Sequence, residues 1–148
     1  MGNEQQRNGE LTRRWFEEVW NQGRAATIDE LLAPDVVAWG LGAGGKPLRG
    51  PAEFRQFYQP FRDAFAYLRV VVEDVLADAD KTAVRLSFSG RHTGAGLGVP
   101  PTGRPFTSTA LGIAHWRNGQ IIEMWNEFDA AGMMAQLHDA QPAIAQRP

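Results

Sequence analysis

Three carboxylates and a tryptophan alternate along one short stretch of the chain. Between Gln120 and Asp129, the residues Glu123, Trp125, Glu127 and Asp129 are spaced two apart. Side chains two apart in a β-strand point to one face of the sheet, so a strand here would gather all four on a single face. A carboxylate in an apolar surrounding has a raised pKa and can move protons near neutral pH. The pattern predicts a pocket on this face, with its carboxylates, Asp129 among them, as candidates for acid/base chemistry.

Asp129 also fits a purely structural role. The run from Ala130 to Leu137 reads as a short helix that starts immediately after it. Asp is a favoured N-cap residue, because its side chain accepts a hydrogen bond from the backbone of the first helical turn. The residues alone leave both roles open.

The position of His115 depends on one turn. Asn118-Gly119 between two apolar runs predicts a β-hairpin. A two-residue turn would put His115 opposite Ile122, on the face away from Asp129. A three-residue turn with a bulge would put it opposite Ile121, on the Asp129 face.

The apolar spacing predicts the elements that must position these residues. Helices are expected over 10–21, 27–32, 51–65 and 130–137, with a kink or break at Pro60. Strands are expected over 35–39, 68–76, 82–91, 106–116 and 120–128, and tails over 1–8 and the final ten residues. Helices followed by a meander predict one α+β domain over 1–148, with a core of about 10–138. In it, a curved antiparallel sheet and N-terminal helices form a cone-shaped pocket.

The composition excludes several classes of protein. A net charge of −2 without a cluster of Lys and Arg argues against nucleic-acid binding, and no apolar run is long enough for a membrane span. The chain has no Cys, and its three His are scattered, so no metal site is expected. The polar N-terminus does not read as a signal peptide, which favours a cytoplasmic protein. Five Trp and eight Phe indicate a wide aromatic interior.

Four segments carry the motifs of a known family. They are WNQGRAATIDELLAPDVV, LRGPAEFRQFY, SGRHTGAGLGVPPTGRPF and GQIIEMWNEFDAAGMMAQL. From about residue 10 to residue 138, the chain resembles the SnoaL-like polyketide cyclases of the nuclear-transport-factor-2-like superfamily. The resemblance implies the cone fold, a small hydrophobic or aromatic polyketide-like ligand and no cofactor. Because this superfamily carries several activities on one fold, individual residues must separate them.

For two other activities of the superfamily, this chain lacks some of the catalytic residues. Ketosteroid isomerases resemble the chain in the first helix, but Phe16 stands where they have an oxyanion-hole Tyr, and Gly40 where they have the base Asp. A Phe cannot donate a hydrogen bond to an enolate oxygen. Limonene-epoxide-hydrolase-like members need an Asp-Arg-Asp set. Arg85 could be that Arg, but Ser87 stands where the first Asp should be, unless Glu127 replaces it.

The cyclase pattern matches better. SnoaL-like aldol cyclases have a strand-end Asp, matched by Asp129, and a His on the neighbouring strand, matched by His115. The resemblance implies an intramolecular aldol closure in which Asp129 is base and acid, and His115 or His92 stabilises the oxyanion. His92 could instead pin the Gly-rich loop that follows it. The residues expected to bind substrate are His92, Trp125, Glu127, Trp39, Phe16, Phe54, Tyr58 and Phe61. Plain core packing would also explain each of the aromatic residues from the helices.

The expected assembly is a homodimer through the outer face of the sheet. Two other functions stay open. One is hydration, dehydration or epoxide opening, using Asp129 with Glu127 or Arg85. The other is a non-catalytic small-molecule-binding domain, in which Asp129 only caps the last helix and the cavity is dry and apolar.

Overall fold

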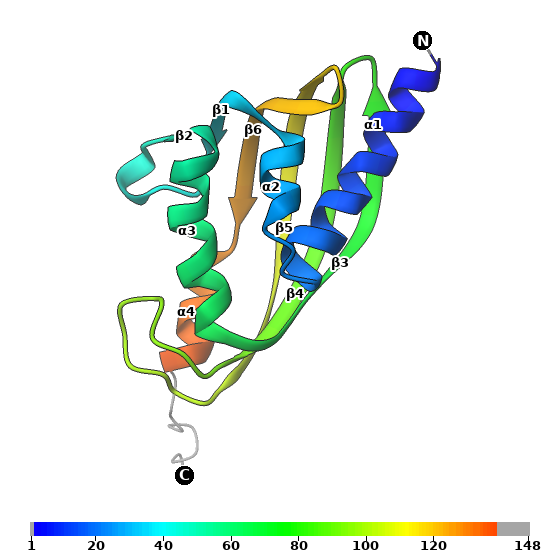
Figure 1. Cartoon of the computed structure of the whole chain (residues 1–148). Helices are drawn as coiled ribbons and strands as arrows, with labels where there is room; N and C mark the ends of the chain where they lie inside the picture. Colours follow the sequence, from blue (N-terminus) through cyan, green and yellow to red (C-terminus); the bar gives the residue numbers. More distant parts are fainter. Residues whose placement is uncertain (1, 139–148) are drawn as a thin grey trace.

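The computed structural model describes residues 2–138, in which helices lie on one face of a curved six-stranded sheet (Figure 1). The helical elements are α1 (Gly2–Trp15), the π-helical turn η1 (Phe16–Asn21), α2 (Ala26–Leu31), the 3₁₀ turn η2 (Ala43–Gly45), α3 (Gly50–Ala64) and α4 (Ala130–His138). The strands are β1 (Leu32–Trp39), β2 (Leu48–Arg49), β3 (Phe65–Asp78), β4 (Lys81–His92), β5 (Pro105–Arg117) and β6 (Gln120–Phe128). This order confirms the expected α+β class.

The sheet is mixed rather than purely antiparallel. Its strand order is β2-β1-β6-β5-β4-β3, and β3 to β6 form the expected antiparallel meander. β1 joins the meander parallel to β6, and β2 adds an antiparallel edge. The parallel contact arises because α3 and β3–β5 separate β1 from β6 in the chain, so the connection is a crossover rather than a turn.

Two helix predictions need correction. Residues 2–8 are not a tail, because α1 begins at Gly2 and its first turns pack along β3. α3 passes Pro60 without a break. A proline inside a helix costs about 3 kcal/mol, and the buried face of α3, with Phe54, Tyr58 and Phe61, offsets that cost by packing on the core. The expected C-terminal tail, 139–148, lies outside the described residues.

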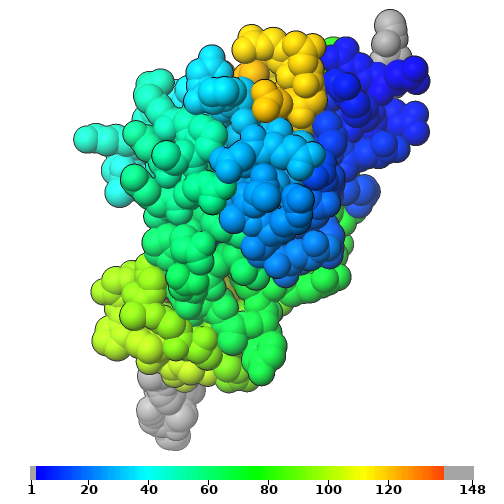
Figure 2. Space-filling view, viewed as in Figure 1, coloured from blue at the N-terminus to red at the C-terminus, as the bar shows by residue number. Residues whose placement is uncertain are grey.

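The core fills the space between the helices and the inner face of the sheet. One apolar cluster joins α1, η1, α2 and the start of α3 to β1 and β6, and a second joins the end of α3 and α4 to β3, β4 and β5. Figure 2 views the molecule from the helix side, where α1, α2 and α3 cover the sheet and the loop after β4 packs beside the end of α3. None of the helices within residues 2–138 is long and apolar enough to cross a membrane.

The hairpin between β5 and β6 combines the two turns considered above. Asn118 and Gly119 both have positive φ, 53° and 78°, and form a two-residue turn with Arg117 opposite Gln120. One residue later the register shifts, so that Trp116 faces Ile121 but His115 faces Glu123. The extra residue in β6 is Ile122, which forms a β-bulge.

This bulge decides which side chains of β6 enter the core. Ile121 and Met124 are 2% and 5% exposed and share the inner face, although they are three apart. After the bulge, Met124 and Asn126 face inward, whereas Glu123 and Trp125 face outward. The structure keeps Glu123, Trp125 and Glu127 on one face, as predicted, but Ile121 lies on the opposite face because the bulge breaks the period of two before Glu123.

Candidate functional site

An apolar cavity lies between the helices and the inner face of the sheet. It has an internal volume of about 90 Å³, within about 690 Å³ of space between atoms that includes its open mouth. Its lining consists of Trp15, Phe16, Trp20, Leu41, Phe54, Phe57, Phe61, Leu68, Val70, Val84, Leu86, Phe88, Ala110, Leu111, Gly112, Met124, Asn126 and Phe128.

The cavity exists because the residues on the inner face in the middle of the sheet are small. The inner face of β5 carries Ala110, Gly112 and Ala114 in succession, between the buried Phe106 and Trp116. On the neighbouring strands, these small residues face Leu86, Val84 and Thr82 on β4 and Phe128, Asn126 and Met124 on β6. Larger residues at the three positions would fill the core, so the hollow is encoded in one strand.

The helix side of the cavity is a cluster of aromatic rings. The π-helical turn presents Phe16 and Trp20 to the cavity, with Gln22 N–H donating to Glu17 O, five residues back, at 2.9 Å. The Trp20 ring meets Phe57 and Phe61 of α3 edge to face, at centroid distances of 6.2 and 5.7 Å. Such pairs are the favoured geometry of aromatic contacts. The result is a rigid wall suited to a flat, apolar ligand.

Asn126 supplies the polar contact in this lining. Among the described lining residues, it is the one with an amide, hydroxyl, imidazole or carboxyl side chain. Its Nδ2 donates to the backbone oxygen of Trp39 at 3.0 Å, which fixes the amide plane. Gly40 has φ of 89°, and a Cβ there would collide with the Asn126 backbone oxygen, so only glycine lets β1 end this close to β6. Within residues 2–138, the second N–H and the Oδ1 of Asn126 make no hydrogen bond to the protein, so both are available to a ligand.

The residues that predicted an acid/base face lie on the other side of the sheet. Glu123, Trp125 and Glu127 are on the outer face, and Trp39 joins them there, its Nε1 donating to Glu123 Oε2 at 2.8 Å. The cavity is lined instead by the alternate residues of β6. The prediction that Trp39, Trp125 and Glu127 line the pocket is therefore wrong. The physical reason is that the helices cover the face that carries Met124 and Phe128.

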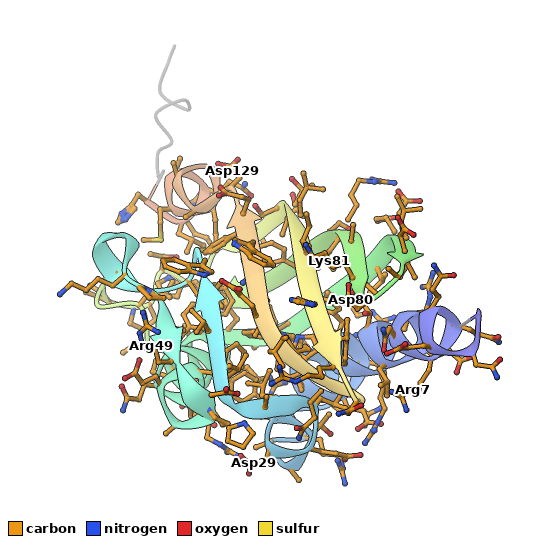
Figure 3. All side chains as sticks on the ribbon, turned by 90° about the horizontal axis from the view of Figure 1, so that it is seen from above. Arg7, Asp29, Arg49, Asp80, Lys81 and Asp129 are labelled. Carbon is orange, nitrogen blue, oxygen red and sulfur yellow. The ribbon has the colours of Figure 1, made fainter. Side chains whose placement is uncertain are left out.

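His115 also lies on the outer face. Its Nε2 is 2.8 Å from Asp80 Oδ2, and this hydrogen bond lowers the pKa of the Asp80 carboxyl below its usual range. His115 faces Glu123, six residues before Asp129 along the chain, which is about 20 Å of strand. Figure 3 labels Asp80 and Asp129 at separate places on the sheet. The structure does not bring His115 to Asp129.

Asp129 occupies the N-cap position of α4. Its Oδ1 accepts a hydrogen bond from Gly132 N–H at 2.9 Å, and its side chain is exposed beside the start of the helix (Figure 3). This is the capping geometry that was the alternative to a catalytic role.

His92 is buried at the inner end of β4. Its Nδ1 accepts a hydrogen bond from Thr102 N–H at 3.2 Å, so the neutral ring carries its proton on Nε2. Nε2 has no hydrogen-bond partner among residues 2–138. Burial is the main cause that lowers the pKa of His92 below its ordinary value of 6.5. These contacts match the loop-pinning alternative, and the cavity lining given above does not include His92.

Most of the aromatic residues that were expected to line the pocket from the helices do line it. Phe16, Phe54 and Phe61 line the cavity, as expected. Tyr58 does not, because its ring packs in the core and its hydroxyl donates to Val19 O at 2.7 Å. Burial raises the pKa of the Tyr58 hydroxyl. Within residues 2–138, no three His, Cys, Asp or Glu side chains gather in a geometry that could hold a metal ion.

Sequence reasoning missed Asn126 because it took the face of Glu123, Trp125 and Glu127 as the pocket face, whereas the helices cover the opposite face. The signal that could have found it is the run of small residues at 110, 112 and 114, which marks the inner face of β5. Asn126 lies directly opposite Gly112.

Acid should weaken the folded state through His92. An unfolded chain protonates this ring below about pH 6.5, whereas the folded chain keeps it neutral to a lower pH, so stability falls as the pH drops through this window. The slope is at most about 1.4 kcal/mol per pH unit. We expect His92→Gln to remove this component of the slope in urea denaturation between pH 6.5 and 5. Equal slopes for the two proteins would contradict the assignment, since the carboxylates contribute alike to both.

The chain matches one protein family over most of its length. The model of the SnoaL-like polyketide cyclase family matches residues 10–137. The aklanonic acid methyl ester cyclase AcmA of Streptomyces galilaeus is 27% identical over 131 residues, covering 88% of this chain and 90% of that protein. The nogalonic acid methyl ester cyclase of Streptomyces nogalater is 29% identical over 126 residues, covering 84% and 92%.

Solved structures agree with the fold. A SnoaL-like protein from Jannaschia sp. CCS1 superposes with a TM-score of 0.83 at 25% identity, covering 93% of this chain and 95% of that one. IdmH from Streptomyces antibioticus superposes with a TM-score of 0.76 at 32% identity, covering 88% and 97%. The match over residues 10–137, on a cone whose aromatic cavity is now described, means that the chain belongs to the SnoaL-like polyketide cyclase family.

Proposed function

We propose that the protein is a cofactor-independent cyclase that closes a ring in a polyketide-like ligand held in the apolar cavity. The observation that carries this proposal is an aromatic cavity whose described lining offers one fixed amide, Asn126. Family membership supports it, because the relatives above are named as cyclases of aklanonic and nogalonic acid methyl esters.

The aromatic walls would act by confinement. A flexible chain with several carbonyl groups must fold back on itself before a carbon–carbon bond can form. Rings such as Trp20 and Phe57 offer flat surfaces that favour the compact, stacked arrangement and exclude water from it. Holding two reacting carbons in contact can remove several kcal/mol from the barrier.

Asn126 would stabilise the oxygen that gains charge. In an aldol closure, the carbon next to one carbonyl loses a proton and bonds to the carbon of a second carbonyl, whose oxygen then takes a proton. The reaction is balanced in protons and electrons, so it needs no co-reactant. The free N–H of Asn126 can donate to the developing alkoxide, while its other N–H stays on Trp39 O. An amide cannot act as a base, so in this proposal water at the open mouth accepts the carbon-bound proton.

Asp129, His115 and His92 have no proton-transfer role in this proposal. Asp129 is engaged in capping α4, His115 binds Asp80 on the outer face, and His92 binds the Thr102 backbone. Hydration or epoxide opening by Asp129 with Glu127 or Arg85 loses support, because Glu127 faces outward and the Arg85 guanidinium binds Asp74 at 2.7 Å.

A second candidate is a domain that binds its ligand without turnover. The observation that favours it is the lack of a carboxylate or imidazole in the described lining, together with the capping role of Asp129. Binding of an anthracycline-type methyl ester precursor without conversion, under conditions in which a related cyclase converts it, would support this candidate.

Replacing Asn126 tests the cyclase proposal. Asn126→Leu has nearly the same volume but no amide, so we expect ligand binding to persist and turnover of the methyl ester precursor to fall about a hundredfold, the usual cost of one oxyanion donor. Turnover is followed by chromatography of the product, with melting temperatures measured for both proteins.

The matched control is Glu127→Gln, a change on the outer face of the same strand, which should keep wild-type turnover. Undiminished turnover by Asn126→Leu would refute the role of the amide. No turnover by the wild-type protein would exclude this class of ester and leave the binding candidate.

Two substitutions at Asp129 separate a cap from a base. Asn caps a helix about as well as Asp, whereas Ala does not, and loss of a cap costs about 1 kcal/mol. We expect Asp129→Asn to retain both stability and turnover, and Asp129→Ala to lose about 1 kcal/mol in urea denaturation with its turnover kept. A folded Asp129→Asn protein without turnover would instead make this carboxylate the general base.

We further propose that two copies pair through the outer face of the sheet. One continuous row crosses five strands there, from β1 to β3, and consists of Trp39, Trp125, Ile113, Ala83 and Leu76. Its neighbour Leu111 is 59% exposed, Leu76 is 70% exposed and Ile113 is 46% exposed. Exposed apolar patches of this kind mark interfaces.

The charged residues beside this row suit a two-fold contact. On one side lie Glu123, His115 and Lys81, and on the other lie Glu127, Arg85 and Asp74. Both signs occur on each side, so a second copy turned by 180° can oppose unlike charges. The apolar row would then be buried against its own copy.

A charge in the middle of the row should separate the copies. We expect Ile113→Lys to convert a dimer to a monomer, because two ammonium groups would be buried in the contact. Sedimentation velocity measures the mass. Tyr67→Ser is the control, since Tyr67 is 86% exposed on β3 away from the row. A wild-type monomer at micromolar concentration would refute the proposed dimer.

A further inference from the structure

A second, smaller cavity lies next to the first one. It has an internal volume of about 30 Å³, which is room for one or two water-sized groups but not for a ring. It is lined by Thr12, Trp15, Phe16, Thr82, Val84, Gly112, Ile113, Ala114, Trp116, Ile121, Met124 and Asn126. Half of these residues, including Gly112 and Asn126, also line the main cavity.

Gly112 lies on the boundary between the two cavities, since it lines both. A Cβ at this position would lie 3.5 Å from Val84 Cγ1 and 3.7 Å from Asn126 Oδ1, in the space that both cavities border. Its φ is not positive, so the backbone does not require glycine here. The missing side chain therefore leaves space at this boundary, and this is the place at which a substituent on a ligand in the main cavity would enter the smaller one.

Two hydroxyl side chains in the lining of the small cavity, Thr12 and Thr82, belong to a chain of hydrogen bonds. Trp116 Nε1 donates to Thr82 Oγ1 at 2.9 Å, the Thr82 and Thr12 hydroxyl oxygens are 3.0 Å apart, and Thr12 Oγ1 donates to Asn8 O at 2.8 Å. All four residues are less than 5% exposed. They form a chain of hydrogen bonds from β5 through β4 to α1.

The direction of this chain follows from its two ends. The indole of Trp116 can only donate, and the carbonyl of Asn8 can only accept. The protons must therefore run from Trp116 to Thr82, from Thr82 to Thr12, and from Thr12 to Asn8. The hydroxyls of Thr82 and Thr12 each donate one hydrogen bond and accept one. Each therefore has one remaining lone pair that can accept a further hydrogen bond.

This end of the molecule also carries buried polar atoms that have no partner within residues 2–138. The Asn8 side chain, one turn before Thr12, is 1% exposed, and neither its oxygen nor its nitrogen has a hydrogen-bond partner among residues 2–138. Buried polar groups without partners cost free energy, so they favour a group that can satisfy them. A group that enters from the main cavity must donate a hydrogen bond to meet Thr12 and Thr82.

We infer that the small cavity is a subsite for a hydroxyl group on the ligand. A phenolic or enolic O–H would donate to the free lone pair of Thr12 or Thr82, while its ring stays in the aromatic main cavity. A ketone or ether oxygen, which only accepts, would face two hydroxyls with no proton to give. The inference rests on the proposed binding of an aromatic ligand in the main cavity and names the substituent that the ligand carries.

Three ligands of nearly equal size test the subsite by isothermal titration calorimetry. They are 2-naphthol, which donates, 2-methoxynaphthalene, which only accepts, and 2-methylnaphthalene, which does neither. For the wild-type protein we expect 2-naphthol to bind about three- to tenfold more tightly than 2-methylnaphthalene, the worth of one net hydrogen bond. The methoxy compound should gain nothing over the methyl compound.

Variants then assign the preference to the hydroxyl chain. We expect Thr12→Val to abolish the preference for 2-naphthol and Thr12→Ser, which restores the hydroxyl, to keep it. Thr109→Val is the matched control, because Thr109 lies on the outer face of β5 next to Leu111. Each preference is a ratio of two affinities within one protein, so a general loss of stability does not alter it.

The outcomes distinguish this inference from the proposed function. Equal binding of all three ligands by the wild-type protein, or an unchanged preference in Thr12→Val, would overturn the subsite and leave the aromatic cavity standing. No binding of any of the three would overturn both. A preference for the methoxy compound would reverse the deduced direction of the chain and refute the inference.

Discussion

One extra residue in β6 controls the chemistry that this fold can present. The bulge at Ile122 places Ile121 and Met124 together on the inner face, and from there Asn126 and Phe128 follow. Without the bulge, a strand that kept Ile121 in the core would turn Glu123 and Trp125 inward, burying a carboxylate among aromatic rings. Burying a charge without a partner is costly, whereas the outer face gives Glu123 water and the Trp39 indole. The bulge thus lets the strand begin and end in the core while it keeps its carboxylates outside.

The hollow in the sheet is a deliberate gap in an otherwise well-packed core. The small residues of β5 create this gap, and the aromatic rings of η1 and α3 support it by packing edge to face rather than by collapsing into it. The fold therefore keeps space for a ligand where larger side chains would otherwise fill the core.

The two faces of the sheet differ in polarity. The inner face holds apolar side chains, one fixed amide and the buried hydroxyl chain, while the outer face holds the carboxylates and His115 together with a row of exposed apolar side chains. The same strands build both faces, because alternate residues point opposite ways. Gly40 and Gly112 mark the two places where the inner face needs the absence of a side chain, once so that two backbones can meet and once so that space stays open.

The sequence by itself determined the α+β class, the meander of β3 to β6, the hairpin at Asn118-Gly119 and the aromatic lining from Phe16, Phe54 and Phe61. These features follow from local periodicity and turn chemistry, which act over a few residues. The tertiary structure alone decided which face of β6 meets the helices, and with it the outward positions of Trp125, Glu127 and His115 and the inward position of Asn126. The period of two shows which residues share a face of the strand, but not which face is buried. A single bulge moves all later side chains to the opposite face. The sequence predicted the helix cap at Asp129 as one of two possible roles. It could not predict the hydrogen-bond chain from Trp116 to Asn8, because its members come from three elements that only folding brings together.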